Sequence, residues 1–215
     1  MSTMGAERML IESAVPAFDA MLDEHVVVAA DPATTYRAAR GLDLLTVRTP
    51  LLAASMWLRN LLARLSGRAV PTPPRLVLGE NELPGWLVLG DRPNREFAFG
   101  AIGKFWQPVI EWRDVTPADF TTFAEPGWAK IGANFSVAAY GDSHSLLSYQ
   151  CRTATTDPAA RRNFLRYWWL IRPFAAHIMR ATLKTIRANA EAAARSAGDH
   201  PPAVTSGVEG RHPHR

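Results

Sequence analysis

Two residues on predicted strands could take part in acid–base or polar chemistry. His25 lies in "AMLDEHVVVAA" (20–30), and Tyr149 lies in "HSLLSYQCRTAT" (144–155). An imidazole can exchange a proton near neutral pH, and a buried phenol needs a polar partner, so it can orient a polar group of a ligand. His25 would serve in this way only if its side of the strand faces a cavity. A hydrogen-bonded structural histidine is the alternative.

Other chemistries have no supporting motif. The chain has no G-x-S-x-G and no H-E-x-x-H sequence, and the glycines of "GENELPGWLVLG" lack both phosphate-loop spacings. Cys151, the only cysteine, has no activating partner in the sequence and is interpreted as a small buried hydrophobe. We therefore expect no cofactor and no metal site. Turns and solvation account for the acidic residues Glu80, Glu82, Asp91 and Glu96.

A set of large apolar side chains is the main candidate for ligand contact. Its members recur on one side of several short runs and of the last long segment. They could line a cavity for an apolar molecule, or they could fill an ordinary core. The set consists of Phe97, Phe99, Phe135, Tyr149, Phe164, Trp168 and Ile171.

A basic face on the last segment is the second candidate. Trp169 projects toward that face between Arg166 and Arg172. An indole among arginines suits weak contact with an anionic membrane surface, or contact with a protein partner. A solvated helix face, or cover by the N-terminal segment, would also explain the pattern. A basic helix that packs against a sheet is not placed to enter a groove of DNA or RNA, so binding to nucleic acid is not expected.

Composition indicates one ordinary domain. The chain has 215 residues, of which 47% are hydrophobic, and its net charge is +4. The single cysteine and the lack of a signal-peptide pattern predict a cytoplasmic protein without a membrane span. We expect a flexible segment at 1–17, a domain at 18–196 and a disordered Pro/Gly-rich tail at 197–215.

The elements that must position these residues follow from periodicity and capping. A strand at 20–30 precedes a helix that Asp31 and Pro32 start, and a second helix spans 49–67. Short runs separated by turn residues then predict antiparallel strands between 75 and 155, including 75–80, 109–113 and 119–125. A helix begins at Asp157 and Pro158 and continues to about Arg195, with a kink at Pro173.

Two strands alternate with a period of two. Apolar Ile131, Ala133, Phe135 and Val137 share one side of their strand, and the other side is polar. This pattern predicts a sheet that is covered on one face only. The long helix has an apolar stripe to match that face, and a ligand cavity is expected between the two. The stripe consists of Phe164, Trp168, Ile171, Ala175, Ile178, Thr182 and Ile186.

This order of elements resembles the helix-grip fold of the START/SRPBCC superfamily, which includes Bet v 1-like proteins and polyketide cyclases. The resemblance is carried by "HVVVAADPATTYRAA", "REFAFGAIGKFW" and "SYQCRTATTDPAARRNFLRYWWLIRPF". The last stretch is similar to that of bacterial members in which an Arg ends the last strand and a "YW…RPF" segment follows. Here these positions are Arg152, Tyr167, Trp168, Arg172, Pro173 and Phe174. The resemblance implies an α+β domain with six or seven curved antiparallel strands around the long C-terminal helix, and two short helices after the first strand.

Three functions remain open on this reading. The chain could bind a small hydrophobic molecule, such as a lipid or a polyketide, as a carrier or sensor. It could be a cyclase/dehydratase-like enzyme that uses the same cavity, with His25 or Tyr149 as the proton-transfer group. It could also be a peripheral membrane or partner-binding module that uses the basic face. The sequence leaves the oligomeric state open.

Overall fold

The computed structural model describes residues 8–42 and 85–198 of the chain. Within these residues, no helix is long and apolar enough to cross a membrane. The elements in chain order are α1 (Leu10–Ala14), β1 (Ala20–Val28), α2 (Pro32–Arg40), β2 (Trp86–Arg92), β3 (Glu96–Gly103), α4 (Pro117–Phe120), β4 (Ala129–Tyr140), β5 (His144–Thr155) and α5 (Pro158–Gly198).

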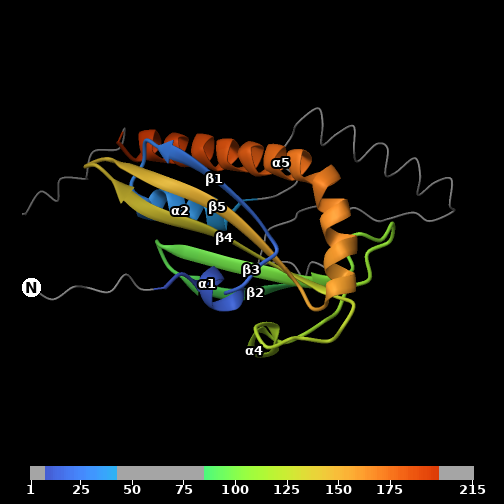
Figure 1. The fold of residues 1–215 in the computed structure, drawn as a ribbon. Coiled ribbons are helices and arrows are strands. Elements are labelled where there is room, and N and C mark those ends of the chain that lie inside the picture. The colour runs from blue at the N-terminus through green and yellow to red at the C-terminus, as the bar shows by residue number, and fades with distance from the viewer. Residues whose placement is uncertain (1–7, 43–84, 199–215) are drawn as a thin grey trace, which may run out of the picture.

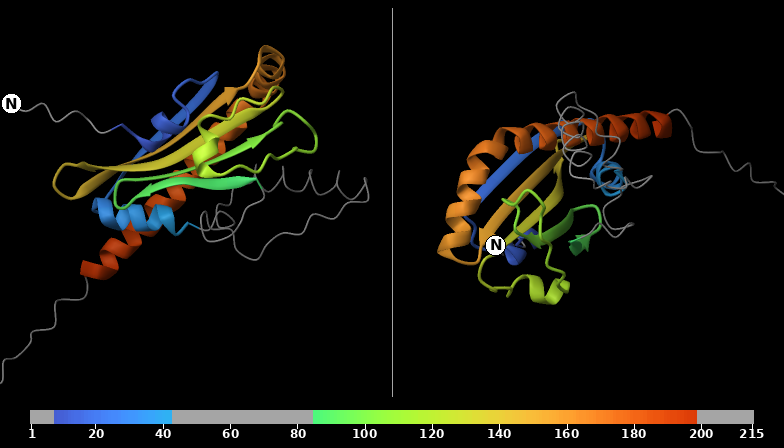
Figure 2. Two further views of the ribbon diagram at one scale, coloured as in Figure 1. Left: turned by 90° about the horizontal axis from the view of Figure 1, so that it is seen from below. Right: turned by 90° about the vertical axis from the view of Figure 1, so that its right-hand side faces the viewer.

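The strands form one antiparallel sheet with the order β1-β5-β4-β3-β2. The sheet is twisted and curved, and α5 crosses one of its faces while α1 and α4 lie on the other (Figures 1 and 2). We call the side toward α5 and α2 the inner face and the opposite side the outer face. The register aligns Phe97 with Phe135 and Phe135 with Tyr149, so these three rings share the inner face. The α+β arrangement of a curved sheet and a long C-terminal helix is confirmed.

The helix starts follow the predicted capping. The side chain of Asp31 accepts a hydrogen bond from the backbone N–H of Thr34 at 3.0 Å, and Pro32 occupies the first turn of α2. The carboxylate of Asp157 accepts from the backbone N–H groups of Ala159 and Ala160 at 2.7 and 3.0 Å at the start of α5. Local sequence therefore determines where both helices begin.

Helix α5 bends sharply part-way along its length (Figure 1), and Pro173 is the proline inside it. Proline removes one helical hydrogen bond and crowds the carbonyl four residues earlier, which accounts for the bend. The buried stripe changes phase there. Before the bend, Ala160 and Phe164 are buried; after it, the buried positions are Ala176, Met179, Thr182, Leu183, Ile186 and Ala190. The expected stripe holds at Phe164, Thr182 and Ile186, but Ala175 and Ile178 are only half-buried.

The main core lies between the inner face and the two helices α2 and α5. Apolar side chains of β1, β3, β4 and β5 pack there against Tyr36 and Ala39 of α2 and against Leu183 and Ile186 of α5. Burial of this apolar surface stabilises the fold by about 25 cal/mol per Å² removed from water. The core therefore fastens the second half of α5, after the bend, to the sheet.

The outer face is also covered, which corrects the expectation of a sheet packed on one face only. Ile11 and Val15, at the start and just after the end of α1, are almost completely buried against it. A Cβ atom on Gly132 of β4 would lie 2.7 Å from Cγ2 of Val15, so glycine permits this close approach. The expected flexibility of residues 1–17 therefore does not hold for α1. Ile11 and Val15 are four residues apart, which is the spacing of one helix face.

Two predicted strands are also corrected. Residues 109–113 form no named strand; only an isolated bridge joins Trp112 to Gly103. The run 119–125 begins inside α4, because Thr116 caps that helix by accepting from the backbone N–H of Asp119, and Pro117 opens it. The sheet has five strands among the described residues; the expected six or seven included the run 75–80. The predicted helix 49–67, the strand 75–80 and nearly all of the tail 197–215 lie outside the described residues.

Candidate functional site: the inner face of the sheet

A continuous group of aromatic rings crosses four strands on the inner face. The ring centroids of Phe135 and Tyr149 are 4.4 Å apart, and those of Phe99 and Phe135 are 5.8 Å apart. Trp86 of β2 extends the group, with its ring 5.7 Å from that of Phe99. Such tilted pairs at this separation attract one another beyond simple burial. Because the strands are in register, residues far apart in sequence form one apolar surface.

The members of the predicted ligand-contact set differ in burial. Phe97, Phe99, Phe135 and Phe164 keep at most 3% of their surface exposed, so in this arrangement they are core residues. Tyr149, Trp168 and Ile171 are only half-buried. Trp86, Val88 and Cys151 belong with this accessible group, because they also pack against the core while keeping some exposed surface. No sequence pattern singled out Trp86, and Cys151 is more accessible than the small buried hydrophobe expected from sequence.

Tyr149 and Cys151 are deeply placed and yet partly accessible. Burial raises the pKa of the Cys151 thiol to about 12, and burial, with Cys151 as a lesser cause, raises the pKa of the Tyr149 phenol well above its usual value. Both side chains are therefore neutral at physiological pH. Among the described residues, the Tyr149 hydroxyl has no hydrogen-bond partner, and it is not among the fully enclosed unpaired atoms. This hydroxyl is available to an external polar group.

His25 lies on the outer face, which corrects its placement near a cavity. Its partner in the register is Ser148, and both side chains point away from α5, while neighbouring Glu24 and Val26 occupy the inner face. Nδ1 of His25 is 2.7 Å from Oγ of Ser148, and Nε2 is 3.5 Å from Oδ1 of Asp23. The strand is apolar on both sides at 26–28, so alternation alone did not settle which side met the helix. His25 and Tyr149 therefore cannot act on one bound molecule.

The contacts of Ser148, His25 and Asp23 do not form a nucleophilic site. Acyl transfer needs backbone or side-chain donors aimed at the developing oxyanion. Ser148 lies on β5, which pairs with β1 on one side and with β4 on the other, so its backbone donors are engaged in the sheet. The side chain of His25 is half exposed on an open surface. His25 is therefore a hydrogen-bonded structural histidine, which was the alternative to a role in proton transfer.

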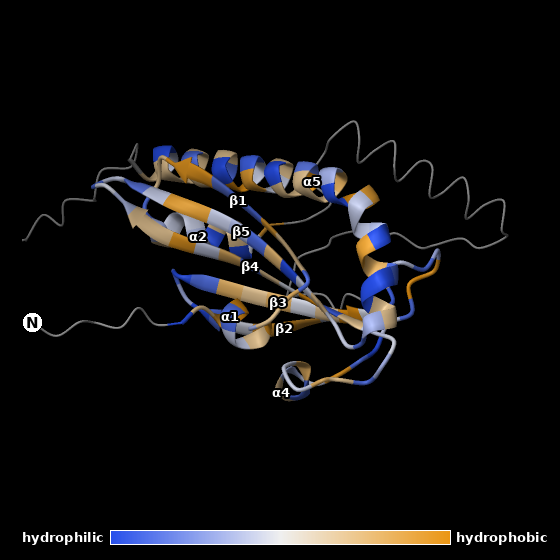
Figure 3. Ribbon diagram, in the orientation of Figure 1, coloured by the Kyte–Doolittle hydropathy of each residue, from blue (hydrophilic) through white to orange (hydrophobic). Residues whose placement is uncertain are grey.

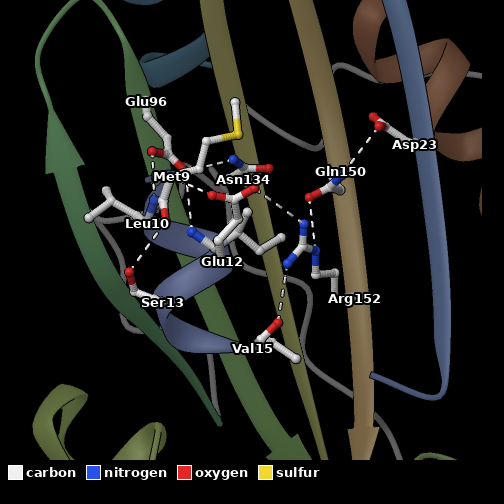
Figure 4. A network of polar contacts seen from close by, with 11 residues as sticks. Met9, Leu10, Glu12, Ser13, Val15, Asp23, Glu96, Asn134, Gln150 and Arg152 are labelled. Atoms are coloured by element: carbon white, nitrogen blue, oxygen red, sulfur yellow. Dashed lines mark hydrogen bonds and ion pairs between the residues drawn. The ribbon is translucent and has the colours of Figure 1, made fainter. Parts of the chain in front are cut away.

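A second polar network fixes α1 on the outer face (Figure 4). Glu96 is 2% exposed, and its carboxylate accepts from the backbone N–H of Leu10 at 2.8 Å, from that of Ile11 at 3.3 Å and from Nδ2 of Asn134 at 2.7 Å. Arg152 reaches the carbonyl of Val15 at 3.3 Å and donates to Gln150 at 3.0 Å. A buried carboxylate is stable only with such partners.

Neither Glu96 nor Arg152 was recognised from sequence as part of this network. The interpretation of Glu96 as a solvated turn residue is wrong. Asp91 is exposed, as expected, but it lies on β2 and its carboxylate is also paired. Asp91 accepts a hydrogen bond from the hydroxyl of Tyr36 and forms an ion pair with Arg40 at 3.2 Å. One sequence feature could have indicated the network. Glu96 and Asn134 both lie on the polar side of their alternating strands, and the register places them on the same face of the sheet. These contacts hold secondary structure together and provide no reactive group.

The basic face lies on the first half of α5. Trp169 is 82% exposed, and Arg166 and Arg172 are exposed beside it. The side chain of Trp168, one residue away, turns inward and packs near Leu22 and Met179. The predicted division of these neighbouring tryptophans between two faces is therefore observed. Across 8–42 and 85–198, no three His, Cys, Asp or Glu side chains gather closely enough to hold a metal ion.

No family model and no curated protein matches the chain. Several solved structures align with it at low similarity. A hypothetical protein from Helicobacter pylori is 12% identical, with a TM-score of 0.39, over 91% of this chain and 99% of that one. The di-domain ARO/CYC StfQ of the steffimycin biosynthetic pathway is 13% identical, with a TM-score of 0.40, over 83% of this chain and 52% of that one. The chain thus spans about half of StfQ.

The Zhui aromatase/cyclase from Streptomyces sp. R1128 is 12% identical, with a TM-score of 0.33, over 83% of this chain and 98% of that one. Aromatase/cyclases belong to the polyketide cyclase group that the sequence resemblance named. TM-scores this low say nothing about what the chain binds or catalyses.

Proposed function

We propose that the chain binds a small hydrophobic molecule against the accessible part of the inner face, as a carrier or sensor. The observation that supports this most strongly is the state of Tyr149 and Cys151. Burial raises the pKa values of both groups, yet both keep accessible surface. A space deep between the sheet and α5 would reconcile the two facts. Trp86, Trp168 and Ile171 would complete the apolar lining.

The energetics favour an apolar ligand with one polar group. Removal of ligand surface from water provides about 25 cal/mol per Å², before the entropic cost of association. The Tyr149 hydroxyl, which has no partner among the described residues, would then donate a hydrogen bond to the ligand's polar group. No charged residue is needed for this contact, so a neutral acceptor such as a carbonyl fits best. The expected ligand class is a lipid, a polyketide or a similar molecule.

Titration with the uncharged dye Nile red tests this proposal. Wild-type protein should bind the dye at one equivalent, with a blue-shifted emission. Cys151→Phe places a ring in the proposed space and should weaken binding at least tenfold. Val27→Phe adds the same ring to the outer face of β1, where Val27 is 37% exposed, and should leave binding unchanged. Native mass spectrometry of the purified protein would identify a molecule that copurifies.

Absence of stoichiometric dye binding would contradict the proposal. Equal binding by Cys151→Phe and wild type would also contradict it. Both variants should first be checked by circular dichroism and urea unfolding, so that a folding defect is not mistaken for loss of the site.

A cyclase-like enzyme that uses the same space is the second candidate. It would depend on Tyr149, because His25 lies on the other face of the sheet. A phenol whose pKa is raised can donate a hydrogen bond or a proton to a carbonyl oxygen, but it is a poor general base near pH 7. Tyr149→Phe should keep Nile red binding in either case. Loss of conversion of a poly-β-ketone substrate in that variant would favour the enzyme.

A further inference from the structure

The first half of α5 carries two residue stripes with identical spacing on opposite faces. The stripe turned toward the protein consists of Ala160, Phe164, Tyr167, Trp168 and Ile171. The stripe turned outward has the same pattern, shifted by two residues, and consists of Arg162, Arg166, Trp169, Leu170 and Pro173. Because successive helical residues are separated by 100°, a shift of two places the stripes about 200° apart. The outward stripe therefore combines positively charged side chains with large apolar ones.

The apolar part of the outward stripe is unusually exposed. Trp169 and Leu170 are 82% and 72% exposed, the two highest values among large hydrophobic residues in the part of the chain that the structure describes. Isolated exposed hydrophobics are common, but two adjacent ones beside arginines indicate an interaction surface. Figure 3 shows apolar and polar residues alternating along this half of α5.

The charges around Trp169 and Leu170 have no ion-pair partner in the part of the chain that the structure describes. Helix α5 has no acidic residue between 158 and 190. Three of its arginines are paired, namely Arg161 with Asp19, Arg180 with Glu24 and Arg187 with Glu191. Arg166 and Arg172, which flank Trp169, have no ion pair or hydrogen bond within residues 8–42 and 85–198. The surface is therefore apolar at its centre and positive around it.

The bend of α5 presents this surface outward. The ring of a helical proline crowds the carbonyl four residues earlier and bends the helix away from the proline side. The proline therefore lies on the outside of the bend. Pro173 belongs to the outward stripe, and the bend is visible in Figure 1. The stripe thus ends on a protruding corner, a shape that suits a flat surface better than a cleft.

We propose that the outward stripe docks the protein on an anionic lipid bilayer. Trp169 and Leu170 would enter the boundary between headgroups and acyl chains, and Arg162, Arg166 and Arg172 would contact lipid phosphates. A second copy of the chain fits less well, because a symmetric contact would bring the unpaired arginines of both copies together. This membrane contact is separate from the ligand proposal, because it uses the face of α5 that points away from the sheet.

Vesicle flotation tests the docking directly. The full chain should float with phosphatidylcholine vesicles that contain about 30% phosphatidylserine, and should not float with pure phosphatidylcholine. Salt at about 0.5 M should weaken the binding, because it screens charge at the surface. Trp169→Ala combined with Leu170→Ser, and separately Arg166→Glu, should each reduce bound protein at least tenfold. Lys184→Glu, the same charge change on the second half of α5, is the matched control and should bind nearly as wild type.

Each other outcome would overturn this proposal. One is equal binding to neutral and anionic vesicles, and another is undiminished binding of the Trp169/Leu170 variant. A third is absence of vesicle binding together with a dimer, detected by sedimentation velocity, that Trp169→Ala dissociates; this would assign the surface to a second copy. Nile red binding should be unchanged in every variant, so failure of the docking and failure of the ligand site can be distinguished.

Discussion

The two faces of the sheet are closed in different ways. On the outer face, one buried carboxylate accepts three hydrogen bonds, and Gly132 allows Val15 to approach the strand closely. On the inner face, aromatic rings pack together, Tyr149 has no hydrogen bond among the described residues, and Tyr149 and Trp86 remain partly accessible. Directional contacts specify one partner, α1, whereas apolar contacts tolerate different occupants. The difference indicates that the outer face is structural and that the inner face is the adaptable one.

The largest expected effect concerns the reactivity of Cys151. Because burial raises the pKa of this thiol from 9.0 to about 12, the thiolate fraction at pH 8 should fall about 1000-fold. Alkylation by N-ethylmaleimide should slow in proportion. The neutral thiol favours the folded state, so this contribution to stability is full below about pH 9 and is lost as pH rises toward 12.

A cysteine on the outer face of the same strand provides the control. Ser148→Cys in a Cys151→Ala background should react at a rate near that of an exposed thiol. If Cys151 in the wild-type protein reacted as fast as this control, the inner face would not be the desolvated surface described above.

The next effect concerns the carboxylate that holds α1. Glu96→Ala leaves two backbone N–H groups and the Asn134 amide without their acceptor, so the free energy of unfolding should fall by about 3 kcal/mol. Urea unfolding would measure this change. Glu125→Ala breaks an exposed ion pair with Arg113 and should cost less than about 1 kcal/mol. Similar losses in the two variants would mean that α1 is not fastened through Glu96.

One added carbon should be tolerated differently on the two faces. Gly132→Ala would place its Cβ against Val15 and should reduce stability by about 1–2 kcal/mol, even though alanine suits a strand better than glycine. Cys151→Val enlarges a side chain on the inner face of the neighbouring strand and should cost less than about 1 kcal/mol. A double-mutant cycle of Gly132→Ala with Val15→Ala should show coupling that restores part of the loss. Equal costs on both faces would remove the distinction.

The smallest effect is expected for the inner tyrosine. Tyr149→Phe removes a hydroxyl that has no hydrogen bond among the described residues, so stability should change by no more than about 0.5 kcal/mol. Tyr36→Phe is the matched substitution, because the Tyr36 hydroxyl donates to Asp91, and it should cost about 1.5 kcal/mol. Thermal unfolding would compare the two. A large loss for Tyr149→Phe would show that its hydroxyl already has a structural partner.

Local pattern determined most of the elements. Alternation identified β4 and β5, capping by Asp31 and Asp157 located the starts of α2 and α5, and Pro173 marked the bend. The same reasoning separated Trp168 from Trp169. It failed at 119–125, where Thr116 and Pro117 are a helix start that outweighs the strand-like composition.

Tertiary structure decided which side of each alternating strand faces α5 and which side faces away from it. A period of two divides a strand into two sides, but it does not say which side meets the helix, and β1 is apolar on both sides at 26–28, so the position of His25 required the sheet register. Glu96 is buried only because α1, more than eighty residues earlier in the chain, supplies two backbone donors. Hydrogen bonds between residues so distant in sequence leave no local periodicity, and only the folded arrangement brings them together.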